Sequence, residues 1–322
     1  MSAREAAWQR TALAFVSAAR SGRLDLPLPG SGFTKERWAA FANLAEEDLS
    51  LARLGEGHAD AVAILAELDG PSPFPGSRWG VWAANPPGLN VTARRQDGTW
   101  VLRGTKQYCS GARVCTHALV TAAAGDGPRL FAVEVAGVLP REDSWPAAGM
   151  AGSDTLDVEF PGVTALPVGP PGAYTDRPGF SHGGVGVAAC WYGGARAVAK
   201  ALLSAAAKRD VGPHALAHLG AVDLGLRTVR AALWRAADEI DADPGDVRGE
   251  GGPRALRARA LTEAVATDVL RRTGRALGAG PLSHDEAHSR AVADLTVYLR
   301  QHHAERDLER LGELAAEHGV TW

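Results

Sequence analysis

The spacing of apolar residues changes twice along this chain, and this succession limits the folds that the chain can adopt. Up to about residue 70 the apolar positions recur at helical spacing, as in the stripe Trp8, Leu13 and Val16. From residue 71 the pattern becomes short β-rich runs broken by Gly and Pro, and beyond residue 184 it returns to long helical stripes. We therefore predict an α+β protein whose strands are gathered in one central unit.

The central unit is predicted to hold six strands, with a hairpin turn at Asp97-Gly98 between the second and the third. The runs cover residues 78–84, 89–95, 99–108, 117–124, 129–136 and 155–160. A loop is expected at 167–184. Two long helices are then predicted around Trp191–Ala206 and Val222–Ile240, a third one to about Leu277, and a fourth one that starts with a capping box of Ser283 and Glu286.

Composition excludes several classes of protein. A net charge of −3 over 322 residues, with only four lysines, argues against a nucleic-acid partner. No run approaches eighteen apolar residues, so we expect no membrane span, and the charged first twenty residues are unlike a signal peptide. The three cysteines lack metal-ligand spacing, which favours reduced thiols in a cytoplasmic protein and no metal site. No Gly-rich phosphate loop lies between a strand and a helix, so a doubly wound nucleotide fold is unsupported.

Two segments of the β-rich region carry a family resemblance. The stretches 104-GTKQYCSGA-112 and 149-GMAGSDTLDVEFPGV-163, together with the order of the elements, resemble the acyl-CoA dehydrogenase family from about residue 55 to the end. The resemblance implies a shortened N-terminal helical domain (1–70), a central small β-barrel (71–170) and a C-terminal antiparallel four-helix bundle (171–322). It also implies FAD, a small-molecule substrate such as an acyl thioester, and a homodimer or homotetramer.

The resemblance assigns cofactor contacts to the barrel. Tyr108 falls where an aromatic residue abuts the flavin ring, and Ser110 where a hydroxyl hydrogen-bonds near the reactive edge. Strand alternation predicts that both side chains share a face with Lys106. An ordinary barrel strand with a buried Tyr is the alternative interpretation.

Other cofactor positions depart from the family pattern. Ala84 replaces a flavin-binding hydroxyl, while Asn85 and Gly88 are expected to keep polar contacts. Arg275, near the end of the third long helix, is a candidate for a cofactor phosphate, since guanidinium forks pair well with phosphate oxygens. Arginines on a helix are also commonly just solvated.

The catalytic base of the family has no counterpart here. Its glutamate position falls on Leu299 and the alternative position near Gly184, and no Glu occurs between Glu159 and Glu239. His302 follows Leu299 at i+3 on one helical stripe, so an imidazole could act there as general acid or base. The alternative is a histidine that makes only local hydrogen bonds.

Three functions remain open from the sequence. The first is an FAD-dependent oxidoreductase like the acyl-CoA dehydrogenases, with a non-standard or absent base. The second is a flavin-dependent monooxygenase on the same fold, which uses His302 and receives reduced flavin from a partner reductase. The third is a flavin-free binding or scaffold paralogue in a larger assembly. Tyr108 and Ser110 favour the first two, whereas Ala84 and Leu299 favour the third.

Overall fold

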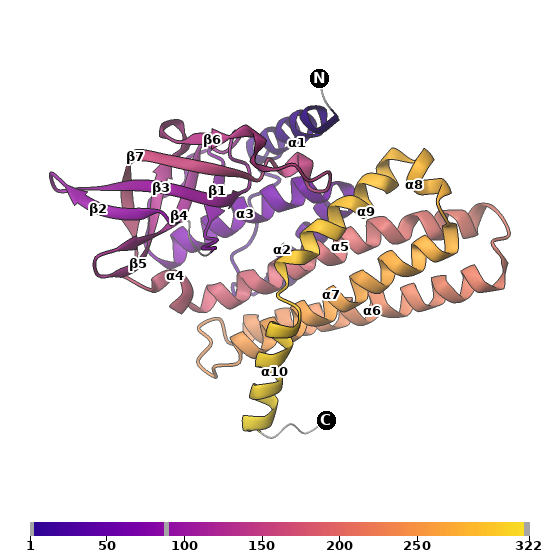
Figure 1. Cartoon of the computed structure of the whole chain (residues 1–322). Helices are drawn as coiled ribbons and strands as arrows, with labels where there is room; N and C mark the ends of the chain where they lie inside the picture. The colour runs from indigo at the N-terminus through magenta and orange to yellow at the C-terminus, as the bar shows by residue number, and fades with distance from the viewer. Residues whose placement is uncertain (1–2, 87–89, 319–322) are drawn as a thin grey trace. The chain divides into compact units, whose positions relative to one another are not determined.

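The structure is a computed structural model that describes residues 3–86 and 90–318 (Figure 1). It contains both helices and strands, as the α+β prediction requires. By their internal contacts the described residues divide into two compact units. Unit 1 holds the chain up to Leu26 and Arg53–Phe180, and unit 2 holds Pro27–Ala52 and the chain from Ser181 onward. The three-domain division at residues 70 and 170 stays a prediction.

Unit 1 is built on a small ring of strands. The neighbours are β4, β2, β3, β7 and β5, and β5 pairs again with β4, which closes the ring. β1 adds to β4 in parallel, and β6 adds to β7. The predicted central barrel is therefore confirmed. The strands are β1 Trp79–Trp82, β2 Thr92–Gln96, β3 Thr99–Cys109, β4 His117–Ala124, β5 Gly127–Glu134, β6 Leu139–Arg141 and β7 Leu156–Val168.

The barrel has one core inside the ring and a second one under a helix. Leu102, Phe131 and Phe160 fill the interior and are at most 1% exposed. On the outside, Ile64 and Leu65 of α3 (Leu49–Glu67) pack against strand residues. Strand alternation sends one side chain inward and the next outward, so one short strand serves both cores. Unit 1 also contains α1 (Ala3–Arg20) and α4 (Ala173–Asp176).

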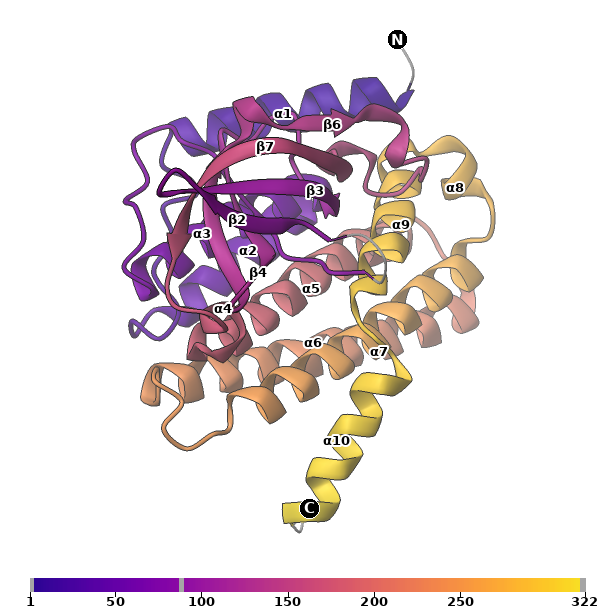
Figure 2. The ribbon, with the colours of Figure 1, turned by 60° about the vertical axis from the view of Figure 1, so that its left-hand side comes forward.

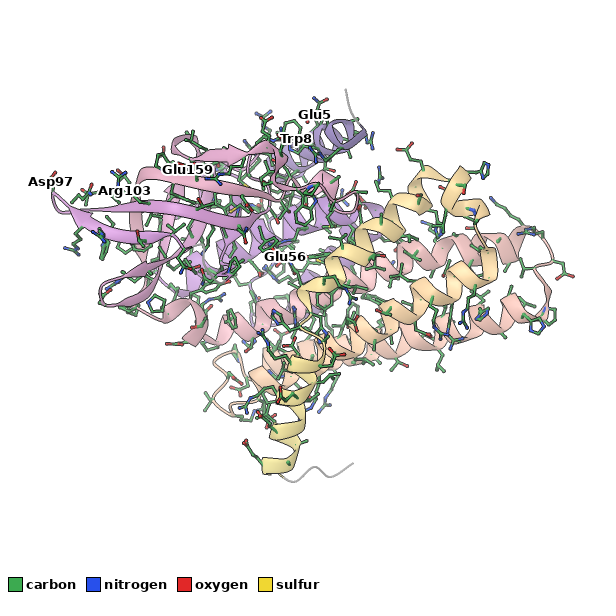
Figure 3. All side chains as sticks on the ribbon, viewed as in Figure 1. Glu5, Trp8, Glu56, Asp97, Arg103 and Glu159 are labelled. Carbon is green, nitrogen blue, oxygen red and sulfur yellow. The ribbon has the colours of Figure 1, made fainter. Side chains whose placement is uncertain are left out.

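The predicted hairpin turn between β2 and β3 is confirmed. Asp97 and Gly98 both adopt positive φ, +50° and +80°, the backbone of the turn that matches the twist of paired strands. Gln96 pairs with Thr99 across it. Figure 3 labels Asp97 at the tip of this ribbon.

The end of β3 breaks the alternation that the sequence predicts. Lys106 pairs with Val158 of β7 and Cys109 with Leu156, so β3 carries one extra residue. Tyr108 absorbs it with a φ of +60°. As a result Lys106 and Cys109 are buried, whereas Tyr108 is 54% exposed. The predicted shared face of Lys106, Tyr108 and Ser110 is therefore wrong.

Unit 2 is helical in its described residues. α6 and α7 lie side by side in both ribbon views (Figures 1 and 2), and the long helices predicted from apolar spacing are confirmed. The predicted loop 167–184 ends earlier than expected, because α5 already begins at Pro178, a residue favoured in the first helical turn. The four-helix bundle stays a prediction. The helices are α2 Thr34–Glu47, α5 Pro178–Lys208, α6 Gly212–Ala242, α7 Gly251–Leu277, α8 Gly280–His284, α9 Glu286–Tyr298 and α10 Glu305–His318.

Both ends of α9 differ from the prediction. Asp285, not Ser283, is the N-cap, and its Oδ1 accepts a hydrogen bond from the His288 backbone N–H at 3.0 Å. Ser283 lies inside the short helix α8, so the predicted capping box is wrong. At the other end α9 stops at Tyr298, and a 3-10 turn separates it from His302, whose backbone is extended.

Within the part of the chain that the structure describes, no helix is both long and apolar enough to cross a membrane. Cys109, Cys115 and Cys190 are buried and free of disulfides.

The corrected cap predicts a difference between two neighbouring substitutions. Asp285→Ala should lower the free energy of unfolding by about 1 kcal/mol, because it removes the acceptor for the first turn of α9. Ser283→Ala, in the exposed helix α8, should change it by less than about 0.5 kcal/mol. Urea denaturation followed by circular dichroism measures both. Equal effects of the two substitutions would contradict the assignment of the cap.

Candidate functional site

The loop after β3 is held by a tight turn that precedes β7. The N–H groups of Gly111 and Ala112 donate to the carbonyls of Ser153 (2.8 Å) and Asp154 (3.3 Å). Arg113 adds its backbone N–H and its guanidinium to the Asp154 carboxylate, at 3.0 Å and 2.6 Å. Because Asp154 is only 3% exposed, this ion pair is shielded from water on the carboxylate side. The two sequence segments that carry the family resemblance therefore pack directly together.

Three hydroxyl groups line up behind this loop. Ser110 Oγ lies 2.9 Å from Thr155 Oγ1, which lies 2.7 Å from Ser153 Oγ. Ser153 in turn donates to the Met150 carbonyl at 2.7 Å. The three hydroxyl-bearing residues are at most 8% exposed, so the chain is a structural network that solvent barely reaches.

Lys106 is the buried cation of the barrel, at 1% exposure. Its Nζ donates to Asn85 Oδ1 (2.6 Å), Thr121 O (2.8 Å) and Thr121 Oγ1 (2.8 Å). These acceptors use all three donors of the ammonium group. Burial lowers the pKa of Lys106 to about 8, since the charged form has lost its water.

The ammonium fixes the orientation of the Asn85 amide. An ammonium has no acceptor, so Asn85 must turn its carbonyl oxygen inward. Its NH₂ group then points to the other side, and the residue itself is exposed. Asn85 thus offers N–H donors at the rim of the barrel.

The two faces at the end of β3 differ in the space that they leave. The cavity beside Ser110 has a volume of about 10 Å³, room for roughly one water molecule. Tyr108, in contrast, presents an aromatic ring that is more than half exposed. The flavin contacts of Tyr108 and Asn85 stay a prediction. Gly88, the remaining predicted contact of this region, lies outside the described residues.

The buried carboxyl group of Glu56 escaped the sequence analysis. It lies on α3 in unit 1 (Figure 3), is 3% exposed and pairs with Arg53. Burial raises its pKa well above the usual range of a carboxyl group, and the neighbouring Asp60 adds to the rise. An acidic residue inside an apolar helical stripe was the available signal, but its partners became visible only in the structure.

His302 is buried in unit 2, at 7% exposure. Its Nδ1 accepts the Ala304 backbone N–H at 3.2 Å, so the proton of the neutral ring must be on Nε2. Nε2 has no hydrogen-bond partner among the described residues, and Asp307 Oδ2 stays 3.6 Å away. Burial lowers the pKa of His302 and keeps the ring neutral at pH 7. In this geometry His302 acts as a hydrogen-bond donor through Nε2. The sequence alone did not distinguish a general acid from a general base at this position.

The His302 ring is held by aromatic and cationic neighbours. Trp191 meets it edge to face, with ring centroids 6.3 Å apart. Arg259 lies over the Trp191 ring at 4.6 Å and donates to the carbonyls of Gly184 (3.2 Å) and Gln301 (2.9 Å). Arg259 therefore fixes the turn that precedes His302, a role that no sequence pattern indicated.

Arg275 occupies the exposed last turn of α7. Its neighbours Arg271 and Arg272 both form ion pairs with Asp268. Arg275 makes no ion pair with any residue that the structure describes. A cation at a helix C-terminus is stabilised by the helix dipole, which accounts for it structurally. Its contact with a cofactor phosphate stays a prediction.

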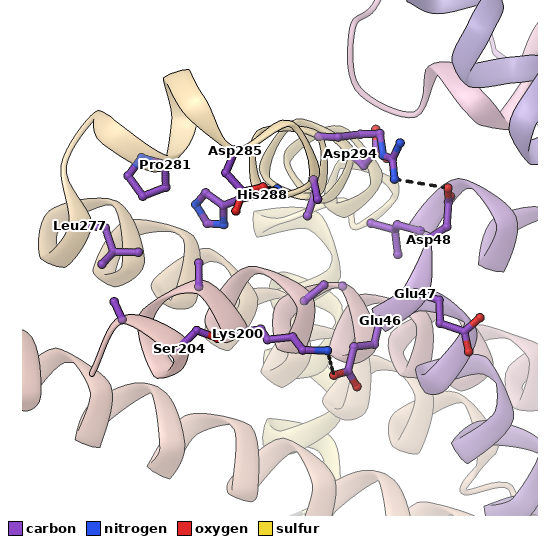
Figure 4. Close-up of a pocket in the computed structure, with 18 of the residues that line it drawn as sticks. Glu46, Glu47, Asp48, Lys200, Ser204, Leu277, Pro281, Asp285, His288 and Asp294 are labelled. Carbon is purple, nitrogen blue, oxygen red and sulfur yellow. Dashed lines mark hydrogen bonds and ion pairs between the residues drawn. The ribbon is translucent and has the colours of Figure 1, made fainter. Parts of the chain in front are cut away.

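Unit 2 also contains a cavity of about 680 Å³, a size typical of small-molecule sites (Figure 4). Two ion pairs border it, Lys200 with Glu46 at 3.7 Å and Arg290 with Asp48 at 3.9 Å. His288 faces it from α9, is 6% exposed, and its Nδ1 has no partner in the described part of the chain. None of the site residues predicted from the sequence lines this cavity. In residues 3–86 and 90–318 no group of three His, Cys, Asp or Glu side chains could hold a metal ion.

Comparison with known proteins gives one curated relative and many similar structures. No protein-family model matches the chain. The amino sugar nitrososynthase DnmZ from Streptomyces peucetius is 29% identical over 182 residues, which cover 51% of this chain and 45% of that protein. The match thus spans less than half the length of this relative.

Two solved structures have folds similar to that of this chain. One is TdsC, a dibenzothiophene monooxygenase from Paenibacillus sp. A11-2, which was solved in complex with FMN and indole. Its structure matches this chain with a TM-score of 0.77 at 19% sequence identity, and the match covers 99% of this chain and 98% of the TdsC chain. A steroid acyl-CoA dehydrogenase variant (Tcur3481-Tcur3483) has a TM-score of 0.72 at 21% identity, covering 96% and 90%. The chain therefore has the acyl-CoA dehydrogenase-like fold, which confirms the sequence resemblance at the level of the fold.

The depressed pKa of Lys106 predicts how stability changes with pH. An unfolded lysine has a pKa of about 10.4, so between pH 8 and 10 the unfolded chain binds more protons than the folded one. The wild type should therefore gain stability relative to Lys106→Met as the pH rises through this window. Urea denaturation at pH 7.5, 8.5 and 9.5 measures the difference. Lys208→Met, at an exposed position, is the control. A stability difference between the wild type and Lys106→Met that does not change with pH would contradict the lowered pKa of Lys106.

Proposed function

We propose that this protein is a flavin-dependent monooxygenase that takes reduced FMN from a partner reductase and oxygenates a heteroatom of a small molecule. The observation that carries the proposal is the fold shared with the FMN-bound monooxygenase TdsC over 99% of the chain. The FMN in that complex also favours FMN over the FAD that the sequence resemblance implied. This proposal was the second of the three functions open from the sequence.

The residues of unit 2 argue against an acyl-CoA dehydrogenase reaction. Such a reaction needs a base beside the substrate α-carbon. Leu299, at the position of the family glutamate, is fully buried and cannot accept a proton. The Nδ1 lone pair of His302 is already occupied by the Ala304 N–H, so this histidine does not replace the base.

The residues of the barrel edge fit a flavin. Tyr108 offers an exposed aromatic face, and Asn85 offers N–H donors to acceptor atoms on the rim of a ring. Arg275 is assigned to the FMN phosphate in this proposal. When bound, a reduced flavin supplies the two electrons with which O₂ yields one oxygen atom to the substrate and one to water. The buried surroundings of Ser110 and His302 exclude bulk water from their polar atoms.

His302 serves in this proposal as a hydrogen-bond donor through Nε2. That N–H is buried and has no partner among the described residues, which costs free energy unless a ligand accepts the bond. Asp307 at 3.6 Å stabilises positive charge on the ring when the proton is shared.

The substrate class favoured here is a primary amine on a sugar-like molecule, since the curated relative is an amino sugar nitrososynthase. A sulfur heterocycle, as in the name of the TdsC enzyme, is the second candidate. A homodimer or homotetramer is part of the proposal. A flavin-free scaffold is the competing function, and it is tested by flavin binding alone.

Loss of the exposed aromatic face should weaken flavin binding. Tyr108→Ala is expected to raise the Kd for FMN about tenfold, which corresponds to a ring contact of about 1.4 kcal/mol. Phe74→Ala removes an equally exposed aromatic side chain of unit 1 and should leave the Kd unchanged. Quenching of FMN fluorescence measures both. Wild-type protein that binds neither oxidised nor reduced FMN would favour the scaffold.

A donor role of His302 predicts an order among its variants. His302→Gln keeps an N–H donor and should retain more turnover than His302→Leu, which has none; a loss of 10²-fold or more is expected for Leu. The assay supplies an NADH-dependent flavin reductase and FMN, and mass spectrometry follows oxygen addition to amino sugar nucleotides or to dibenzothiophene. If both variants turn over like the wild type, His302 has no part in the reaction.

A further inference from the structure

We propose that protonation of His302 releases helix α10 from the rest of unit 2, so that the His302 ring acts as a pH-sensitive latch for this helix. The latch is closed while the ring is neutral and opens when the ring takes up a second proton. All the groups involved belong to unit 2, and the effect needs no flavin, so it goes beyond the proposed function.

α10 is joined to the rest of unit 2 by few polar contacts. Within the described residues, the side-chain hydrogen bonds and ion pairs that leave this helix all start at Asp307 and reach His302 and His303. Leu308 is 52% exposed, and the C-terminal part of α10 extends away from α6 and α7 in both ribbon views (Figures 1 and 2). The polar attachment of the helix is therefore concentrated at its first turn.

The ring of His302 closes the turn that leads into α10. A 3-10 turn ends at Gln301, and Ala304 lies in the left-handed backbone region, with a φ of +49°, directly before the helix. In this conformation the Ala304 backbone N–H donates to His302 Nδ1 at 3.2 Å. Nδ1 can accept this bond only while it carries no proton. The turn thus depends on the lone pair of a titratable ring.

A second proton on the ring removes this lone pair. Both nitrogens of an imidazolium are donors, so Nδ1–H and the Ala304 N–H face each other as two donors about 3.2 Å apart. On the other side of the ring, Asp307 Oδ2 lies 3.6 Å from Nε2 and can follow the charge. Buried donors without an acceptor cost free energy that solvent would return. The doubly protonated ring therefore favours an opened turn.

Burial and the surrounding charges set the pH at which the latch opens. Burial is the largest effect, and it lowers the pKa of His302 below its ordinary value of 6.5. Asp307 and Glu263 favour the second proton, whereas Arg259 and His303 disfavour it. A ring that is released into water regains the ordinary pKa, so opening takes up a proton. Opening is accordingly favoured as the pH falls below about 6.5.

Hydrogen–deuterium exchange of the α10 amides measures this opening. Mass spectrometry of peptides that cover residues 305–318 gives protection factors once the intrinsic pH dependence of exchange is divided out, and peptides of α7 are the internal reference. Wild-type α10 should be protected at pH 7.5, and its protection should fall by up to about tenfold per pH unit below pH 6.5. The protection of α7 should stay constant.

Three single variants separate His302 from its neighbours. His302→Asn keeps an oxygen that can accept the N–H two residues on but cannot be protonated near neutral pH, so α10 should stay protected at pH 5.5. His302→Leu has no acceptor, so protection of α10 should be about tenfold lower than in the wild type at pH 7.5 and independent of pH. His303→Asn, at the exposed histidine of the same turn, is the matched control and should keep the wild-type pH response.

Several outcomes overturn the latch. Wild-type α10 may not keep the same protection at pH 5.5 and 7.5, and His302→Asn may not lose protection as the wild type does. A pH response that disappears in His303→Asn assigns the effect to His303, and a loss shared equally by α7 assigns it to global unfolding. Thermal melting at pH 7.5 shows that each variant is folded. If His302→Leu does not fold, the comparison of the wild type with His302→Asn still decides.

Discussion

The clamp between Arg113 and Asp154 is the interaction on which the candidate site depends. It joins the loop after β3 to the turn before β7, and the nearly buried carboxylate has no other counter-charge of comparable proximity among the described contacts. The Trp8 ring of α1 lies 3.9 Å from the Arg113 guanidinium and covers its other side. Removing one partner of such a pair leaves a buried charge uncompensated, typically at a cost of 3–5 kcal/mol. Ser110, Ser153 and Thr155 lie in the two segments that this contact joins.

The parts of the fold that could be predicted are those set by burial patterns that extend over many residues. The near-continuous apolar run 117–124 and helical stripes such as Val222–Ile240 extend over many residues, so a single exception does not hide the pattern. The end of β3 depends on a single extra residue, which moves the Tyr108 side chain to the other face of the sheet. No sequence pattern indicates this extra residue. The predicted cap of α9 was wrong for a similar reason. Ser283 and Asp285 are both favourable N-cap residues, and only the extent of α8 decides between them.

The sequence predicted which residues form the candidate site, but not which of their polar groups donate and which accept hydrogen bonds. Asn85, Ser110 and His302 were identified from the sequence, yet each group can in principle donate or accept. The structure removes this freedom through a neighbour that has only one option: the Lys106 ammonium can only donate, the Met150 carbonyl can only accept, and the Ala304 N–H can only donate. Hydrogen-bond polarity is a property of the whole network, so it cannot be assigned residue by residue from a sequence.

The buried ammonium of Lys106 restricts what can replace its neighbours during evolution. Position 85 must keep an oxygen directed inward, so Asn and Asp satisfy the ammonium, whereas an aliphatic side chain there would leave one N–H without an acceptor in the barrel wall. Asp would also add a counter-charge and remove the outward N–H donors at the same time. Among homologues of this chain, loss of the oxygen at position 85 should therefore coincide with loss of the lysine at position 106.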